Sequence, residues 1–333
     1  MKIKAIWLIM ISAVLLFVIT AVMLTIGTAQ VPFDVVVSVM TERLLGIDNQ
    51  HVTAAQQMIV GKIRWQRVAL AIVVGSGLAV SGACYQTMFK NPLADPFILG
   101  VSSGAALGAA LSMVTHHTQY IIVFAFAGGV VSLSLVYLFG QRSMYIRPER
   151  LLLAGITCSS MLTAILQSVM AMNSQNMNMI VFWLMGSLTN NGENLNFVAA
   201  VVAAGLVVAM IYARDLDVMA LGDETAKSLG VNVDKVKLIL MASTTLMTAA
   251  AVSMSGIIGF IGLIVPHMVR KTVGPEHQVL LLLSAIWGAM FLLLADGLTR
   301  LNPLLATIPV GVVTALIGSP FFLYILYSTS KRP

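Results

Sequence analysis

Apolar segments long enough to cross a bilayer recur along almost the whole chain, each bounded by charged or turn-forming residues. A helix of roughly 20 apolar residues crosses the hydrocarbon layer, so each of these segments is a candidate span. The segment at 259–273 is short and is interrupted by glycine and proline. We expect ten spans, at 5–27, 67–89, 97–115, 119–140, 149–172, 196–213, 236–257, 259–273, 279–298 and 307–328.

The composition agrees with a membrane protein. Of the 333 residues, 59% are hydrophobic and 10% are charged, whereas soluble domains carry about 25% charged residues. The first apolar run, 5–27, exceeds the roughly 7–15 residues of a signal peptide, so we expect it to be retained as a span. The sequence thus predicts an all-α, polytopic membrane protein, solvated by lipid, with one transmembrane domain over 1–333.

The distribution of basic residues predicts the orientation. With both termini in the cytoplasm, fourteen of the 19 Lys and Arg residues lie in inner segments, as the positive-inside rule requires. The net charge of +6 therefore reflects topology, and we expect no nucleic-acid partner. The five basic residues on the outer side are Arg43, Lys62, Arg64, Arg67 and Arg300.

Ionisable groups are scarce inside the spans. Asp296 is the one acidic residue in an apolar segment, and it lies near the outer end. Ion-coupled carriers usually place such groups near the middle of the bilayer, although unwound backbone carbonyls can also bind sodium. A secondary transporter therefore stays open as an alternative. An intramembrane enzyme is disfavoured, since the sequence has no paired acids, HExxH motif or Ser/His constellation, and we expect no catalytic residues.

Metal ligation is not expected. Cys84 and Cys158 lie in apolar runs without a CxxC partner, which is typical of buried packing residues. The neighbouring His116 and His117 point in different directions on a helix or strand. His267 lies near the inner end of its expected span. Methionine commonly fills irregular apolar gaps, and this is the role expected for Met170, Met172, Met177 and Met179.

One connection, 214–237, is long and holds nine charged residues. Asp217 and Asp223 are plausible N-caps, and Gly222 and Gly230 plausible stops, for two short helices. Such a coupling elbow suits docking to a soluble protein, although an ordinary solvated loop is the alternative. The residues expected to make the contact are Val218, Met219, Leu221, Asp223, Glu224 and Leu229.

A nucleotide-binding motif is absent from the sequence. GxxxxGK[ST] does not occur, and the single Gly-Lys pair, Gly61-Lys62, is followed by Ile63. ATP-driven transport would therefore need ATPase subunits made as separate chains, and the coupling elbow would be their docking site.

Five stretches carry a family resemblance: 63–111, WLMGSL (183–188), LGDETAKSLGV (221–231), GIIGFIGLIVPHMVR (256–270) and IPVGVVTALIGSPFFLYIL (308–326). In this order they resemble the FecCD-type ABC importer permeases. The resemblance implies a permease subunit of a bacterial or archaeal cytoplasmic membrane, with ten spans. It also implies a second permease, identical or paralogous, two ATPases that bind ATP-Mg, and an extracytoplasmic binding protein, with no cofactor in this chain.

The cargo that the resemblance implies first is a ferric siderophore. Haem or cobalamin ranks second, and an oxyanion such as molybdate or tungstate ranks third.

Arg64 and Arg67 lie three residues apart at the outer start of a span, against the positive-inside rule and beside the positive end of the helix dipole. In the family, arginines at these places and at Arg300 resemble sockets for glutamates of the binding protein. Membrane anchoring, or pairing with Asp34, Glu42 or Asp48, is the alternative. The family's usual Arg-x-Pro-Arg is here Arg64-Trp65-Gln66-Arg67, so the rigid turn is missing.

The motif NPLADP (91–96) resembles the family's inner constriction, where Asn91 and Leu93 would narrow the exit as a cytoplasmic gate. Two prolines and an asparagine also end a helix in any protein, so a plain turn is the alternative.

Overall fold

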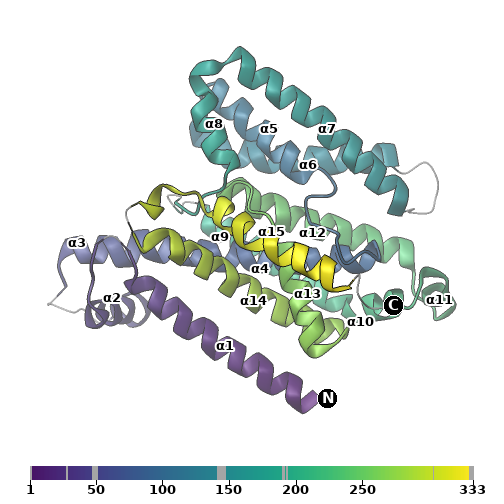
Figure 1. Ribbon diagram of the computed structural model, residues 1–333, viewed down its shortest axis with the longest axis horizontal. Coiled ribbons are helices and arrows are strands. Elements are labelled where there is room, and N and C mark those ends of the chain that lie inside the picture. The colour runs from purple at the N-terminus through teal and green to yellow at the C-terminus, as the bar shows by residue number, and fades with distance from the viewer. Residues whose placement is uncertain are drawn as a thin grey trace.

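The structure is a computed structural model that describes residues 2–27, 29–46, 52–140, 148–189, 192, 194–302 and 304–329. Within these ranges the regular secondary structure is helical (Figure 1). The α-helices are α1 (Lys2–Thr25), α2 (Phe33–Leu45), α3 (Ala54–Gln56), α4 (Trp65–Met88), α5 (Val101–Val114), α6 (Ile121–Gly140), α7 (Pro148–Met172), α8 (Met177–Leu184), α9 (Leu195–Ile211), α10 (Ala213–Ala220), α11 (Asp223–Ser228), α12 (Val233–Ser255), α13 (Ile261–Val273), α14 (His277–Arg300) and α15 (Val310–Thr329).

Each of the ten expected spans corresponds to one of these helices, so the all-α, multi-pass architecture is confirmed. Six helices in the described ranges are long and apolar enough to cross a membrane, and the bent pair α9–α10 makes a seventh candidate. The helices α5 and α15 contain shorter apolar stretches, and α13 has Pro266 inside it. The count of ten crossings and the cytoplasmic termini remain predictions.

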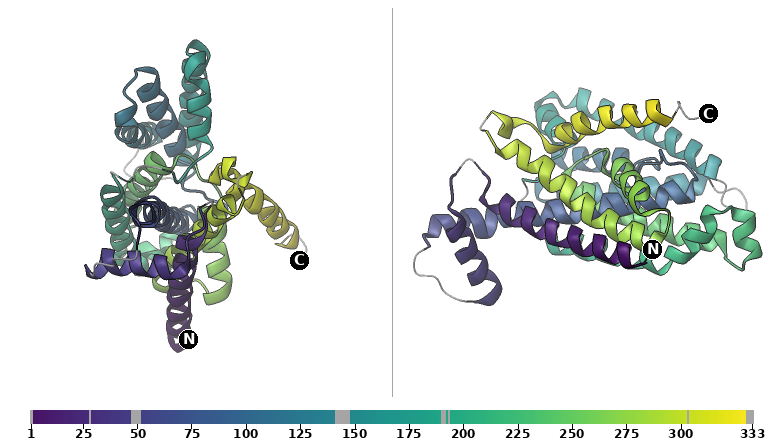
Figure 2. Two further views of the ribbon diagram at one scale, coloured as in Figure 1. Left: turned by 90° about the vertical axis from the view of Figure 1, so that its left-hand side faces the viewer. Right: turned by 60° about the horizontal axis from the view of Figure 1, so that its bottom comes forward.

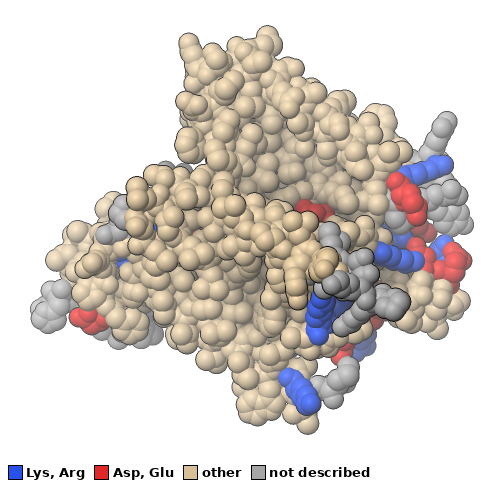
Figure 3. All heavy atoms as spheres, in the orientation of Figure 1, with Lys and Arg blue, Asp and Glu red and all other residues tan. Residues whose placement is uncertain are grey.

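The two ends of the helix bundle differ. The start of α1, the end of α15 and the helices α10 and α11 lie toward one end, which we name the elbow end, while α2 and α3 lie toward the other, the arginine end (Figure 1). On the face in Figure 3, charged side chains gather at the elbow end, and the middle of the molecule is almost free of them. Four basic residues counted on the inner side lie outside the described ranges: Arg142, Arg147, Lys331 and Arg332. Asp48, named above as a possible partner of the arginines, also lies outside them.

The core is organised around α4, which packs against α9, α12, α13 and α14. Glycines allow the closest approaches, because a Cβ added at Gly75 would lie 2.3 Å from the carbonyl oxygen of Gly288 on α14. A Cβ at Gly82 would lie 2.0 Å from the carbonyl oxygen of Gly262 on α13. Lipid provides no hydrophobic driving force for helices to associate, so spans are held together by close packing, which small residues at such contacts allow.

The first helix, α1, lies at the edge of the bundle (Figure 2), and only 11% of its most apolar window is buried. Apart from Lys4 near its start, its exposed described side chains are apolar, among them Trp7, Met10, Val14 and Phe17. Such a surface suits contact with lipid tails.

Several helical segments lie outside the expected spans, among them two helices and a π-helical turn. The helix α2 covers Phe33–Leu45, α8 covers Met177–Leu184, and a π-helical turn, Gln57–Arg64, runs directly into α4. A capping box at Thr53 starts this last stretch, since Thr53 and Gln56 exchange side-chain and backbone hydrogen bonds. The span at α4 therefore begins earlier than its apolar residues indicate, with Arg64 inside a continuous helix.

Candidate functional site

Arg64 lies at the arginine end and is buried, with 5% of the residue exposed. Its Nη1 donates to the carbonyl oxygens of Leu24 at 2.8 Å and Thr25 at 2.7 Å, and its Nη2 donates to the carbonyl oxygen of Ala29. The last carbonyls of a helix lack partners within that helix, and a cation is favoured beside them. The Arg64 guanidinium therefore caps the end of α1.

Arg300, the last residue of α14, caps the same helix end from another side. Its Nη1 donates to the carbonyl oxygens of Met23 at 3.0 Å and Ile26 at 3.3 Å. Its Nη2 lies 3.0 Å from Oδ2 of Asp296, one turn earlier on α14. Two arginines from distant parts of the sequence thus fasten the end of α1.

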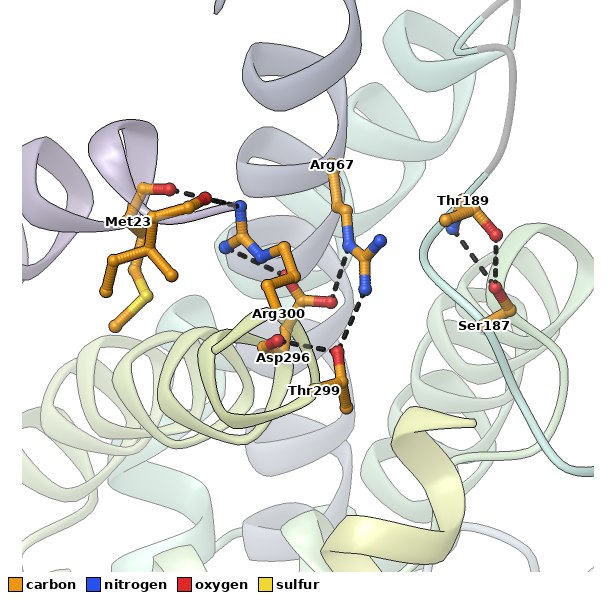
Figure 4. Close-up of polar contacts among 8 residues, drawn as sticks. Met23, Arg67, Ser187, Thr189, Asp296, Thr299 and Arg300 are labelled. Atoms are coloured by element: carbon orange, nitrogen blue, oxygen red, sulfur yellow. Dashed lines mark hydrogen bonds and ion pairs between the residues drawn. The ribbon is translucent and has the colours of Figure 1, made fainter. Parts of the chain in front are cut away.

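Arg67 is the most accessible of the three, with 21% of its side chain exposed. Its Nε donates to Oδ1 of Asp296 at 2.7 Å and its Nη2 to Oγ1 of Thr299 at 3.0 Å, so it joins α4 to α14 (Figure 4). Arg67 also lines an open hollow of about 460 Å³, together with Trp183, Thr189 and residues of α8 and the start of α15.

The structure brings the three predicted arginines together, but their partners differ from those expected. Glu42 accepts a hydrogen bond from Gln57, whereas the arginines use Asp296 and the carbonyls at the end of α1. Arg64 faces the protein interior, whereas Arg67 keeps part of its side chain exposed. The i, i+4 spacing of Asp296 and Arg300 is a signal from which their pairing could have been inferred.

At the elbow end, α10 and α11 form the predicted pair of short helices. Leu221 is 72% exposed and Leu229 64% exposed, whereas Met219 is 1% exposed and packs inside the protein. Met219 must therefore be removed from the expected ATPase contact, while Val218 is half-buried and Glu224 is exposed. The buried face of α10 anchors the elbow and leaves the two leucines on its surface.

Neither aspartate acts as an N-cap. Asp217 lies inside α10 and Asp223 is the first residue of α11, whose N-cap is Gly222. Oδ1 of Asp223 lies 2.8 Å from Nζ of Lys90, and Oδ2 lies 2.5 Å from Nζ of Lys237. Burial acts to raise the pKa of Asp223, but these two ammonium groups outweigh it and hold that pKa below its ordinary value.

Asp217 binds the first residue of α14. Its Oδ1 accepts from the backbone N–H of His277 at 2.8 Å and from Nδ1 of the same residue at 2.6 Å. Nε2 of His277 shares a 2.7 Å hydrogen bond with Oγ1 of Thr87, in the last turn of α4. A carboxylate only accepts hydrogen bonds, so Nδ1 of His277 carries a proton.

The NPLADP segment forms a compact turn that directly follows α4 and Lys90. Oδ1 of Asn91 accepts from the backbone N–H of Leu93 at 2.9 Å, and Oδ1 of Asp95 accepts from that of Phe97 at 2.8 Å. Asn91 is half-buried and Leu93 is exposed. We name residues 91–96 the exit turn; its role as a gate stays a prediction.

Metal-binding groups do not gather in the part of the chain that the structure describes, where no cluster of three or more His, Cys, Asp or Glu residues occurs. Cys84 and Cys158 are both buried as free thiols.

Comparisons with known proteins match nearly the whole chain. A profile of the FecCD transport family matches residues 14–328. The cobalamin import system permease protein BtuC of Halobacterium salinarum is 43% identical over 281 residues, covering 83% of this chain and 75% of the relative. The hemin transport system permease protein HmuU of Yersinia pestis is 39% identical over 273 residues, covering 79% and 81%.

A third relative, the Fe(3+)-citrate import system permease protein YfmD of Bacillus subtilis, is 36% identical over 273 residues, covering 81% of each chain. Among solved structures, a metal-chelate type ABC transporter in an inward-facing conformation matches with a TM-score of 0.84 and 31% identity. That match covers 96% of this chain and 99% of the other.

Proposed function

Because this chain belongs to the FecCD transport family, we propose that it is the permease of a binding-protein-dependent ABC importer. In this proposal two permeases enclose the translocation path, two separate ATPases bind ATP-Mg at the elbow end, and a binding protein docks at the arginine end. The chain is a multi-pass protein of the inner membrane.

The observation that carries the proposal is the coupling elbow. Leu221 and Leu229 are exposed directly after the short helices α10 and α11, which bury their other side chains such as Met219 and Ala226 in the permease. Exposed apolar side chains on a firmly anchored, charged surface are typical of a protein interface. An ATPase subunit is the partner that a transport family without its own nucleotide site requires.

The exposed face of α7 supports a second permease or a water-filled path beside it. Unlike α1, this face carries the polar side chains Thr157, Ser160, Gln167 and Ser168 among its apolar ones. Polar side chains within membrane spans usually face protein or water, not lipid. We place the translocation path of the two-permease core along this face.

For docking, the structure favours Arg67 as the residue that meets the binding protein, with Arg64 and Arg300 holding the surrounding helices. Arg67 lines the hollow at the arginine end and keeps part of its guanidinium accessible. A carboxylate of the binding protein would form forked hydrogen bonds with such a group. The exit turn, with Asn91 and Leu93, would close the path at the opposite end.

The cargo that we propose is a metal chelate, first a ferric siderophore or ferric citrate, then haem or cobalamin. Relatives of this chain are named as import permeases for ferric citrate, hemin and cobalamin. An oxyanion such as molybdate or tungstate is a further candidate.

Reconstitution tests this proposal. The permease, its ATPases and the cognate binding protein in lipid vesicles should take up one of these chelates only when ATP is supplied on the elbow side. An uncoupler should leave uptake unchanged at constant ATP. Uptake that the uncoupler abolishes would instead favour an ion-coupled secondary transporter. Identical or paralogous permeases would be distinguished by the subunits that co-purify.

A further inference from the structure

An ion pair joins the coupling elbow to the segment that we propose as the gate. Asp223, the first residue of α11, pairs with Lys90, which directly precedes the exit turn. We infer that the Lys90–Asp223 pair transmits displacement of the elbow to the exit turn, so that the two move together. This inference rests on the proposed function, because it is the ATPase that would displace the elbow.

The pair is held firmly on the side of the elbow. Asp223 is fixed from the other direction by Lys237 of α12, whose side chain is almost fully buried. Both carboxylate oxygens are thereby engaged within the permease, one by each lysine. This arrangement argues against the earlier expectation that the Asp223 carboxylate itself meets the ATPase.

Lys90 adopts a backbone conformation that few lysines accept. Its φ is +48°, in the left-handed region where glycine is the least strained residue. Glycine would end α4 more favourably, but it has no side chain to reach Asp223. Strained backbone positions that persist often serve function and not stability, and here the lysine supplies the cation of the pair.

The exit turn is braced internally, so a movement at Lys90 carries through it. The side-chain hydrogen bonds that Asn91 and Asp95 accept fix its beginning and its end, the second one coming from Phe97 just beyond the turn. Pro92 and Pro96 fix two φ angles. Pro96 also packs closely against Gly262 of α13, where an added Cβ would lie 2.5 Å from its ring.

A second connection reaches the same end of α4. The chain Asp217, His277 and Thr87 joins α10 to the last turn of α4 through hydrogen bonds of 2.6 and 2.7 Å. The elbow therefore holds the end of α4 at two points, Thr87 in its last turn and Lys90 just beyond it. The elbow, the end of α4 and Lys90 should therefore move as one rigid unit, because displacing the elbow alone would break both connections.

Cysteine labelling measures this transmission without a cargo. In a background with Cys84→Ala and Cys158→Ala, Leu93→Cys would report the accessibility of the exit turn to a water-soluble maleimide. The full complex would be compared without nucleotide and after trapping the ATPases with ADP-vanadate. We expect the labelling rate to change by about 5-fold or more, the lower end of typical coupling between sites.

Lys90→Met and Asp223→Asn should each clearly reduce this change, because they remove one of the two connections, while the ATPases still co-purify and trap nucleotide. The double variant should add nothing further, because both single changes remove the same pair. Lys235→Met is the matched control: it makes the same change at an exposed lysine of the elbow, leaves both lysine partners of Asp223 in place and should keep the response.

Three results would overturn the inference: an unchanged labelling rate in the parent with the ATPases trapped, a full response in Lys90→Met, or a response lost equally in Lys235→Met. A parent complex that fails to bind ATPase would contradict the proposed function itself, and the co-purification step separates the two failures.

Discussion

Arg67 and Asp296 form a 2.7 Å ion pair between α4 and α14, and Asp296 is fully buried. The same carboxylate lies 3.0 Å from Arg300. Two guanidiniums therefore depend on one buried anion for charge compensation, and the caps on α1 depend on the position of one of them.

Asp296→Asn should destabilise the permease by about 3–5 kcal/mol, the usual cost of removing one member of a buried ion pair. Thermal unfolding of the purified permease in detergent would measure the loss. Asp34→Asn, a change at an exposed acid of α2, is the matched control and should leave the unfolding temperature unchanged. Equal unfolding temperatures for the two variants would show that the buried pair contributes little.

Arg67→Ala should weaken the association of the permease with the binding protein by roughly 2–5 kcal/mol, as expected for a partly desolvated interfacial charge pair. Affinity measured at low and high salt would show both the loss and its salt dependence. Lys62→Ala, at an exposed cation nearby, should have a small effect. Wild-type affinity of Arg67→Ala at low salt would contradict the docking role.

Arg64 needs a different experiment. Replacing both Arg64 and Arg67 with Glu, the test that the sequence alone suggests, would also remove the cap on α1, so lost binding could follow from lost structure. Arg64→Ala alone should lower the unfolding temperature, because each hydrogen bond to a charged group contributes about 1.5–3 kcal/mol. If instead stability is kept and only docking is lost, Arg64 belongs to the docking surface.

Leu221→Asp with Leu229→Asp should release the ATPases on co-purification and leave the permease folded, because both side chains are exposed. Leu301→Asp with Leu304→Asp makes the same chemical change at exposed leucines of the opposite end and should retain the ATPases. If the ATPases co-purify undiminished with the first variant, the assignment of the elbow as their docking site is wrong.

Gly82→Ala should destabilise the permease by at least about 1–3 kcal/mol, because the new methyl would overlap the backbone of Gly262. Gly259→Ala provides the contrast: a Cβ there meets nothing within 4 Å. Expression level and thermal unfolding of both variants would decide, and a stable Gly82→Ala would mean that α4 and α13 separate readily.

The spans could be predicted because lipid imposes one simple requirement, a long apolar helix. The π-helical turn before α4 could not, since its residues are mixed in polarity and its start depends on the capping box at Thr53.

At the candidate sites, residue type and side of the membrane brought Arg67, Leu221 and Leu229 to attention. Partners distant in sequence were missed. Asp217 resembles an N-cap until His277, 60 residues later, is placed beside it. In the sequence Met219 cannot be told apart from its exposed neighbours. The helix α10 is only 8 residues long, so its apolar pattern has too few turns to reveal which face is buried.

The caps on α1 also constrain how the protein is made. Its terminal carbonyls are formed first, yet one set of partners follows 40 residues later and the other 277 residues later. Through most of translation the end of α1 is bound by Arg64 but not yet by Arg300. During that time α1 lies in the bilayer as a largely independent helix. Its high apolarity makes that waiting state tolerable. A nascent chain that stops short of Arg300 would leave the first helix loosely held, a recognisable feature for quality-control proteases.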